Sequence, residues 1–164
     1  MKTMRLNDDW KWSDHTEMHL ATARGMMFSR HTDQEYYKNI CVEYRDTIKR
    51  VSDPQGQNYQ QIRMLNSRQP ISNGYQEDGY GQQSTFRAPC IGLCFDDETH
   101  IDQMIEISIE TARMTNHHPL AYLSTFMAAL FTRLALKKVP PETWMAIFLK
   151  FKPKVMDHIQ NFRI

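Results

Sequence analysis

The sequence lacks the features that mark a membrane, secreted or nucleic-acid-binding protein. No apolar run approaches the roughly 20 residues that a membrane-spanning helix needs. The start, Met-Lys-Thr-Met-Arg-Leu-Asn-Asp-Asp, has no apolar stretch of signal-peptide type. The formal net charge is only +1, so no overall field attracts nucleic acid or an anionic membrane. We therefore expect a cytoplasmic protein with neither nucleic acid nor membrane as a partner.

Cysteine is scarce, and the sequence does not surround it with metal ligands. The three residues are Cys41, Cys90 and Cys94. Their odd number and spacing favour reduced, buried thiols, and a zinc site would need further ligands close by. His15 and His19 are four residues apart, but no Glu follows His15 as the zinc-peptidase motif requires. We expect no cofactor on these grounds.

The sequence does contain enough apolar material for one folded domain. Of the 164 residues, 41% are hydrophobic and 24% are charged, a balance typical of globular chains. We assign residues 1–164 to a single domain. Residues 133–164 hold seven Lys or Arg against two acidic residues, so their net charge is +5 and that of the remainder is −4. We interpret this basic stretch as a solvated helix face, with an acidic partner surface as the alternative.

Apolar residues recur at helical spacing along most of the chain, and no strand alternation stands out. The fold class expected is therefore all-α. A polar loop rich in Gln, Asn, Ser, Gly and Tyr should occupy residues 53–88, with one short helix near 59–65. Elsewhere we expect helices over residues 14–29, 33–51, 87–94, 98–114, 120–136 and 141–153, and a last helical segment over 155–162.

Two regions of the sequence, residues 10–29 and 76–150, carry a resemblance to a known family. Residues 12–23 read Trp-Ser-Asp-His-Thr-Glu-Met-His-Leu-Ala-Thr-Ala, and residues 88–94 read Ala-Pro-Cys-Ile-Gly-Leu-Cys. Residues 107–123 read Ile-Ser-Ile-Glu-Thr-Ala-Arg-Met-Thr-Asn-His-His-Pro-Leu-Ala-Tyr-Leu, with Ala-Leu-Phe at 129–131 and Trp144 further on. In this order they resemble the ADP-ribosylglycohydrolases, most closely the ADP-ribosylarginine hydrolase branch, over residues 10–29 and 76–150.

The resemblance implies an orthogonal bundle of helices that removes ADP-ribose from proteins. It implies two Mg²⁺ ions between two acidic clusters, where they activate water and orient the ribose for attack at its anomeric carbon. The family's C-terminal Asp-x-Asp-Ser/Thr motif and its N-terminal Gly-Asp-Ala segment do not occur in this sequence. We therefore expect a partial form of the bundle, incomplete relative to the family.

The resemblance places the first acidic cluster on three consecutive residues. Ser13 and Asp14 stand at metal-ligand positions, and His15 stands where the family has Asp. Asp14 and His15 are thus the positions equivalent to the family's catalytic site. Imidazole is a poorer Mg²⁺ ligand than carboxylate, so metal binding should be weak. The alternative, which we favour, is that Ser13 and Asp14 only cap a helix.

The resemblance also places an ADP-ribose loop over residues 81–87, where the family has Gly-x-Gly-Ala-Ala-Met-Arg. Gly81 and Arg87 match this pattern, whereas Gln83 replaces the second Gly and Ser84 replaces Ala. A side chain at Gln83 should obstruct the close approach of phosphate to the backbone. His118 matches a His of the family's next turn, and its alternative role is to order that turn.

Three hypotheses about function follow from these departures. The first, which we favour, is a catalytically inactive protein that serves as a structural or interaction subunit and binds other protein subunits of a larger complex. The second is an active Mg²⁺-dependent ADP-ribosyl-arginine hydrolase completed by another chain. The third is a non-catalytic module that binds ADP-ribose. A cytoskeletal or ciliary assembly is a further hypothesis about location, for which the sequence contains no motif.

Overall fold

The computed structural model describes residues 13–27, 33–50, 57–65, 74–95 and 97–161, and all of its regular structure is helical. The elements are α1 (Asp14–Met27), α2 (Asp33–Ile48), α3 (Gln57–Met64), α4 (Gln83–Arg87), α5 (Pro89–Cys94), η1 (Glu98–His100), α6 (Ile101–Arg113), α7 (Pro119–Leu136), η2 (Pro141–Thr143) and α8 (Trp144–Asn161). The described residues contain no strand, so the all-α expectation is confirmed.

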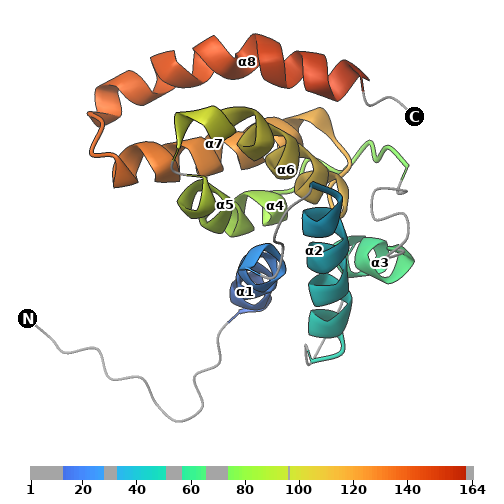
Figure 1. The fold of residues 1–164 in the computed structure, drawn as a ribbon. Coiled ribbons are helices and arrows are strands. Elements are labelled where there is room, and N and C mark those ends of the chain that lie inside the picture. Colours follow the sequence, from blue (N-terminus) through green and yellow to red (C-terminus); the bar gives the residue numbers. More distant parts are fainter. Residues whose placement is uncertain (1–12, 28–32, 51–56, 66–73, 96, 162–164) are drawn as a thin grey trace, which may run out of the picture.

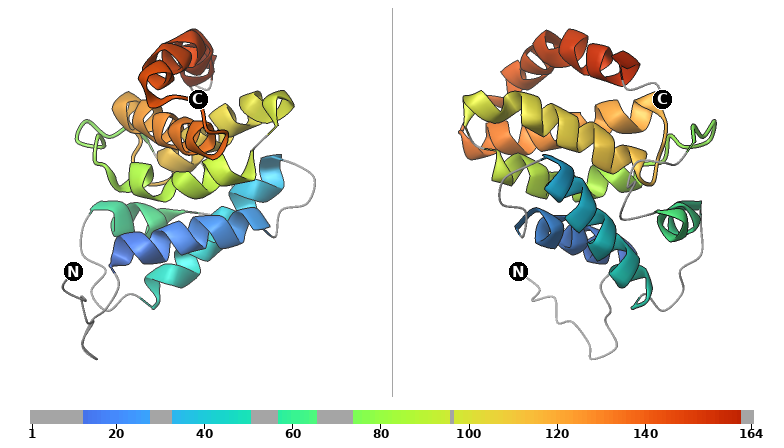
Figure 2. Two further views of the ribbon diagram at one scale, coloured as in Figure 1. Left: turned by 90° about the vertical axis from the view of Figure 1, so that its left-hand side faces the viewer. Right: turned by 45° about the vertical axis from the view of Figure 1, so that its right-hand side comes forward.

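The helices stack in successive layers (Figure 1). The last helix, α8, lies along one side, against α6 and α7. On the opposite side of α7 lie the short helices α4 and α5, and beyond them lie α1, α2 and α3 (Figures 1 and 2). This order places the start of α1, the α4 region and the turn after α6 on connected elements, because α4 packs on α1, α6 and α7.

The core is built around α6 and α7. Nearly every residue from Met104 to Asn116 is buried, including the polar ones. Helix α7 packs on α4, α5, α6 and α8. It is also the one described helix whose length and composition would allow it to cross a membrane, with a mean hydropathy of 1.3. The expectation that no segment approaches a membrane span was therefore too strong, although packing on four helices buries 44% of this helix.

Two glycines allow neighbouring helices to approach closely. A Cβ on Gly25 of α1 would lie 2.6 Å from the Cα of Ile40 in α2. A Cβ on Gly92 of α5 would collide with the backbone oxygen of Ala129 in α7. In both cases the obstacle is backbone, which cannot rotate away as a side chain can.

Most expected helices are confirmed. Periodicity placed α1, α2, α3, α6 and α7 within a few residues of their observed limits. The buried apolar residues of α2 are Tyr37, Ile40, Cys41, Tyr44 and Ile48, which recur at the helical spacing expected for this segment. The expected ends at Ser29, Val51 and Phe162 lie outside the described residues, as do residues 53–56 at the start of the expected loop.

Three expectations need correction. The expected loop over residues 53–88 contains a second helix, α4, in addition to α3. Ser84 and Arg87 of α4 are buried, and this burial stabilises the helix. Cys94 is exposed, whereas Cys41 and Cys90 are buried as expected. The third correction concerns Pro153, which was expected to end a helix but lies inside α8.

Helix α8 continues through Pro153 because contacts on both sides hold it. Proline removes one backbone hydrogen bond, and such a residue normally bends or breaks a helix. Before it, Phe148 is buried against Phe126, with ring centroids 6.0 Å apart. After it, Val155 is fully buried and Lys154 forms an ion pair with Asp102. Figure 1 shows that α8 follows a curved path over α7.

The contact between α5 and α7 yields a stability prediction. Substituting Gly92→Ala should force the two helices apart and lower the free energy of unfolding by about 3 kcal/mol. Gly74→Ala is the matched control, because a Cβ at Gly74 meets nothing within 4 Å. Urea denaturation followed by circular dichroism measures both. Equal stability of the two variants would show that α5 and α7 do not approach each other as described.

Candidate functional site

The start of α1 holds the predicted metal-ligand residues. The backbone oxygen of Ser13 accepts hydrogen bonds from the N–H groups of Thr16 at 3.0 Å and Glu17 at 3.2 Å. The Thr16 N–H also lies 3.4 Å from the Ser13 hydroxyl. Ser13 therefore has the geometry of a helix N-cap, which is the structural interpretation that we favoured for it.

Asp14 already has partners for both of its carboxylate oxygens. Its Oδ1 accepts the backbone N–H of His15 at 3.0 Å, and its Oδ2 accepts the hydroxyl of Tyr59, from α3, at 2.8 Å. Burial, and then the hydrogen bond to Asp14, raise the pKa of Tyr59 far above that of a free phenol. Tyr59 thus remains a protonated donor at neutral pH and ties α3 to the start of α1.

The donor set at this helix start does not fit a pair of magnesium ions. Mg²⁺ needs a near-octahedral array of oxygen ligands, and Ser13-Asp14-His15 supplies one carboxylate. The His15 ring packs on Phe86 of α4, with centroids 5.0 Å apart. Within the described residues, no group of three or more His, Cys, Asp or Glu side chains is placed to hold a metal ion. These residues therefore do not supply the oxygen ligands that a magnesium-dependent step would need.

The predicted ADP-ribose loop lies beside the turn that follows α6. The Gln83 Oε1 accepts a hydrogen bond from the Nδ2 of Asn116 at 3.3 Å. A Cβ added to Gly81 would collide with the same Gln83 oxygen, so the Gln83 side chain folds back over Gly81. Ser84, at the next predicted position, is fully buried.

Arg87 does not face the surface. Its side chain is almost fully buried, with the guanidinium carbon 4.9 Å from the ring centroid of Tyr44 in α2. Its Nη2 donates to the backbone oxygen of Thr111 at 2.9 Å and to the hydroxyl of Thr115. Burial lowers the pKa of the Arg87 guanidinium, and the Tyr44 phenol opposes this effect. The structure thus gives Arg87 a role in joining α4 to α2 and α6.

His118 orders the turn before α7, as its structural interpretation predicted. Its Nδ1 accepts the backbone N–H of Leu120 at 3.2 Å, and Pro119 occupies the first turn of the helix. The exposed rings of Tyr75 and Tyr80 each lie 5.8 Å from the His118 ring, measured between centroids. The loop that carries them is held to the turn by the backbone hydrogen bond from Gln76 to His117, at 3.1 Å.

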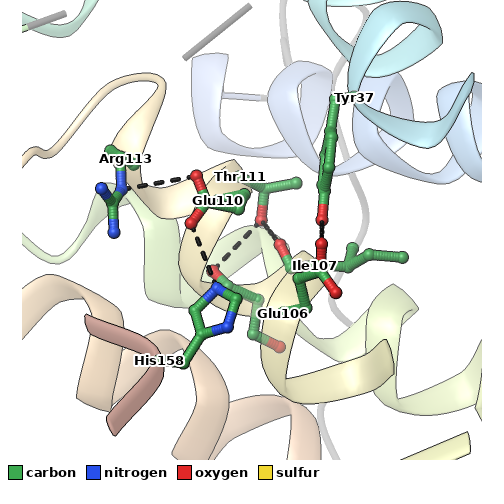
Figure 3. A network of polar contacts seen from close by, with 8 residues as sticks. Tyr37, Glu106, Ile107, Glu110, Thr111, Arg113 and His158 are labelled. Carbon is green, nitrogen blue, oxygen red and sulfur yellow. Dashed lines mark hydrogen bonds and ion pairs between the residues drawn. The ribbon is translucent and has the colours of Figure 1, made fainter. Parts of the chain in front are cut away.

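Sequence reasoning missed a buried ionic cluster around Glu110 (Figure 3). The Glu110 side chain is 0% exposed and pairs with Arg113 at 3.4 Å and with His158 of α8 at 3.3 Å. On the same helix, Glu106 accepts the hydroxyl of Tyr37 at 2.6 Å. The spacing of Glu110 and Arg113 in an apolar helix could have indicated a buried pair, whereas nothing local could have indicated His158. This cluster joins α6 to α8 and α2.

Comparison with known proteins finds similarity to one family. A family model described as ADP-ribosylglycohydrolase matches residues 2–161. The ADP-ribosylhydrolase ARH1 of Dictyostelium discoideum is 29% identical over 175 residues, which cover 98% of this chain and 44% of that protein. The chain therefore spans less than half the length of this relative.

The burial of Arg87 leads to a prediction about stability. Arg87→Met removes the guanidinium donor. The Thr111 carbonyl and the Thr115 hydroxyl, which lie inside the core, then lose this hydrogen-bond partner. The free energy of unfolding should fall by about 2–4 kcal/mol. Arg63→Met, at an exposed position of α3, should change it by no more than about 0.5 kcal/mol. Thermal and urea unfolding compare the two, and an Arg87→Met protein as stable as the wild type would contradict the described packing.

Proposed function

Because the chain belongs to the ADP-ribosylglycohydrolase family, we propose that it is a non-catalytic member that serves as a structural subunit of a larger assembly. The observation that carries this proposal is the state of Asp14. It is the one carboxylate of the Ser13-Asp14-His15 cluster, and both of its oxygens already accept hydrogen bonds within the chain.

Hydrolysis in this family, as the resemblance implies, depends on metal ions that activate water. Neither neighbour of Asp14 can replace a lost carboxylate. Ser13 contributes an uncharged hydroxyl at the N-cap, and an imidazole such as His15 is a poor ligand for a hard cation when neutral and repels it when protonated. A Mg²⁺ ion at Asp14 would also compete with the hydrogen bond from Tyr59.

The packing of the chain supports a structural role. The helices α6 and α7 are closely packed, and the Glu110 cluster fixes α8 on α6. Large apolar side chains nevertheless remain exposed on several elements, and where such side chains form a contiguous patch they favour contact with another protein. They include Leu20, Phe86, Leu93, Leu120, Leu136, Met145 and Leu149. We propose that a protein partner covers part of this surface.

One observation favours a second candidate function, the recognition of ADP-ribose without hydrolysis. Tyr75 and Tyr80 are 63% and 58% exposed, and both lie against His118. Exposed aromatic rings can stack on planar groups of a ligand. Calorimetric titration with ADP-ribose separates the two candidates, since a purely structural subunit should give no heat at millimolar ligand.

The proposal of inactivity predicts the outcome of a hydrolysis assay. The purified protein in millimolar Mg²⁺ should not release ADP-ribose from ADP-ribosyl-arginine. The variant His15→Asp restores one carboxylate and should also remain inactive, because two carboxylates at the start of α1 are too few to hold a pair of Mg²⁺ ions in near-octahedral oxygen coordination. Turnover by the wild type that is lost in Asp14→Ala would contradict the proposal. The same turnover in both proteins would reveal a contaminating hydrolase.

A further inference from the structure

Four side chains join the core to the loop in one continuous series of hydrogen bonds. Arg87 Nη2 donates to the Thr115 hydroxyl. That hydroxyl donates to Asn116 Oδ1 at 2.9 Å. Asn116 Nδ2 then donates to Gln83 Oε1 at 3.3 Å. The series begins at a fully buried cation and ends on the carboxamide that lies over Gly81.

The chemistry of the first member sets the direction of every later bond. A guanidinium has donors only, so the Thr115 hydroxyl accepts from Arg87, and its own proton is donated to Asn116 Oδ1. The Asn116 amide therefore turns its oxygen to Thr115 and its NH₂ group to Gln83. An NH₂ group can pair only with the oxygen of the Gln83 carboxamide, so the orientation of both amides follows from Arg87.

Gly81 completes the arrangement because it has no side chain. A Cβ at this position would collide with Gln83 Oε1 and would approach Asn116 Nδ2 to 3.3 Å. The Gln83 carboxamide therefore occupies the space that the absence of a Cβ leaves open. It is also the far end of a flexible side chain, so it can rotate away at modest cost.

We propose that the Gln83 side chain, held by its hydrogen bond to Asn116, closes this loop by covering the backbone of Gly81. The inference rests on the second candidate function, the recognition of ADP-ribose without hydrolysis, because ADP-ribose, the group that the family's name specifies, is the ligand that the closed loop disfavours. The carboxamide covers the Gly81 backbone that a polar ligand group would have to approach. The ligand must first break the bond to Asn116, and one neutral hydrogen bond of this kind shifts an equilibrium by about two- to tenfold.

Replacing the closure tests it directly. In a calorimetric titration with ADP-ribose without Mg²⁺, Gln83→Gly should bind about fivefold or more tightly than the wild type, or should give binding heat where the wild type gives none. Asn116→Ala should act in the same direction but more weakly, because it frees Gln83 without removing it. Gln82→Gly is the matched control, since the exposed Gln82 makes no side-chain bond to α4, and it should leave affinity unchanged.

The outcomes separate this inference from the proposal of inactivity. A folded Gln83→Gly protein that binds ADP-ribose no better than Gln82→Gly would overturn the closure and leave inactivity intact. Hydrolysis by the wild type would overturn inactivity and leave the closure intact. If the variants fail to fold, a measurement on the wild-type protein still tests the closure. The closure predicts Asn116 side-chain NH₂ protons that exchange slowly with solvent by nuclear magnetic resonance, and rapid exchange would refute it.

Discussion

The rest of this structure depends on the interactions that the buried guanidinium of Arg87 makes. A cation taken out of water is costly unless the protein replaces its hydration. Here the replacement comes from the Tyr44 ring, the Thr111 carbonyl and the Thr115 hydroxyl. These partners belong to α2, to α6 and to the turn after α6, so the requirement to satisfy one side chain of α4 joins three separate parts of the chain.

That constraint extends to the residues that a ligand would otherwise use. Arg87 faces inward, and the bonds that satisfy it lead through Thr115 to Asn116 and Gln83. At the start of α1, Asp14 is likewise engaged by Tyr59. The positions that resemble a binding and catalytic site therefore make their polar contacts within the chain. This internal use of polar groups, together with His15 at a position where the resemblance implies Asp, is the physical basis for proposing a structural role.

Sequence patterns predicted the helices that bury one clear face, and they failed where distant contacts decide. The stripe of α2 and the caps of α1 and α7 are local features, so Tyr44, Ser13 and His118 could be placed in advance. Pro153 was misjudged because the contacts that keep α8 intact come from α6 and α7. In the candidate site, Asp14 and Gln83 were found by resemblance. Their partners Tyr59 and Asn116 lie 45 and 33 residues away, and no local pattern connects them.

The most direct test of the central claim is a high-resolution crystal structure of the protein grown with Mg²⁺ and ADP-ribose. The account predicts that Asp14 keeps its hydrogen bond to Tyr59 without a metal ion, and that Arg87 remains between Tyr44 and Thr115. A pair of Mg²⁺ ions bound at Asp14, or an Arg87 turned outward onto a diphosphate, would contradict it.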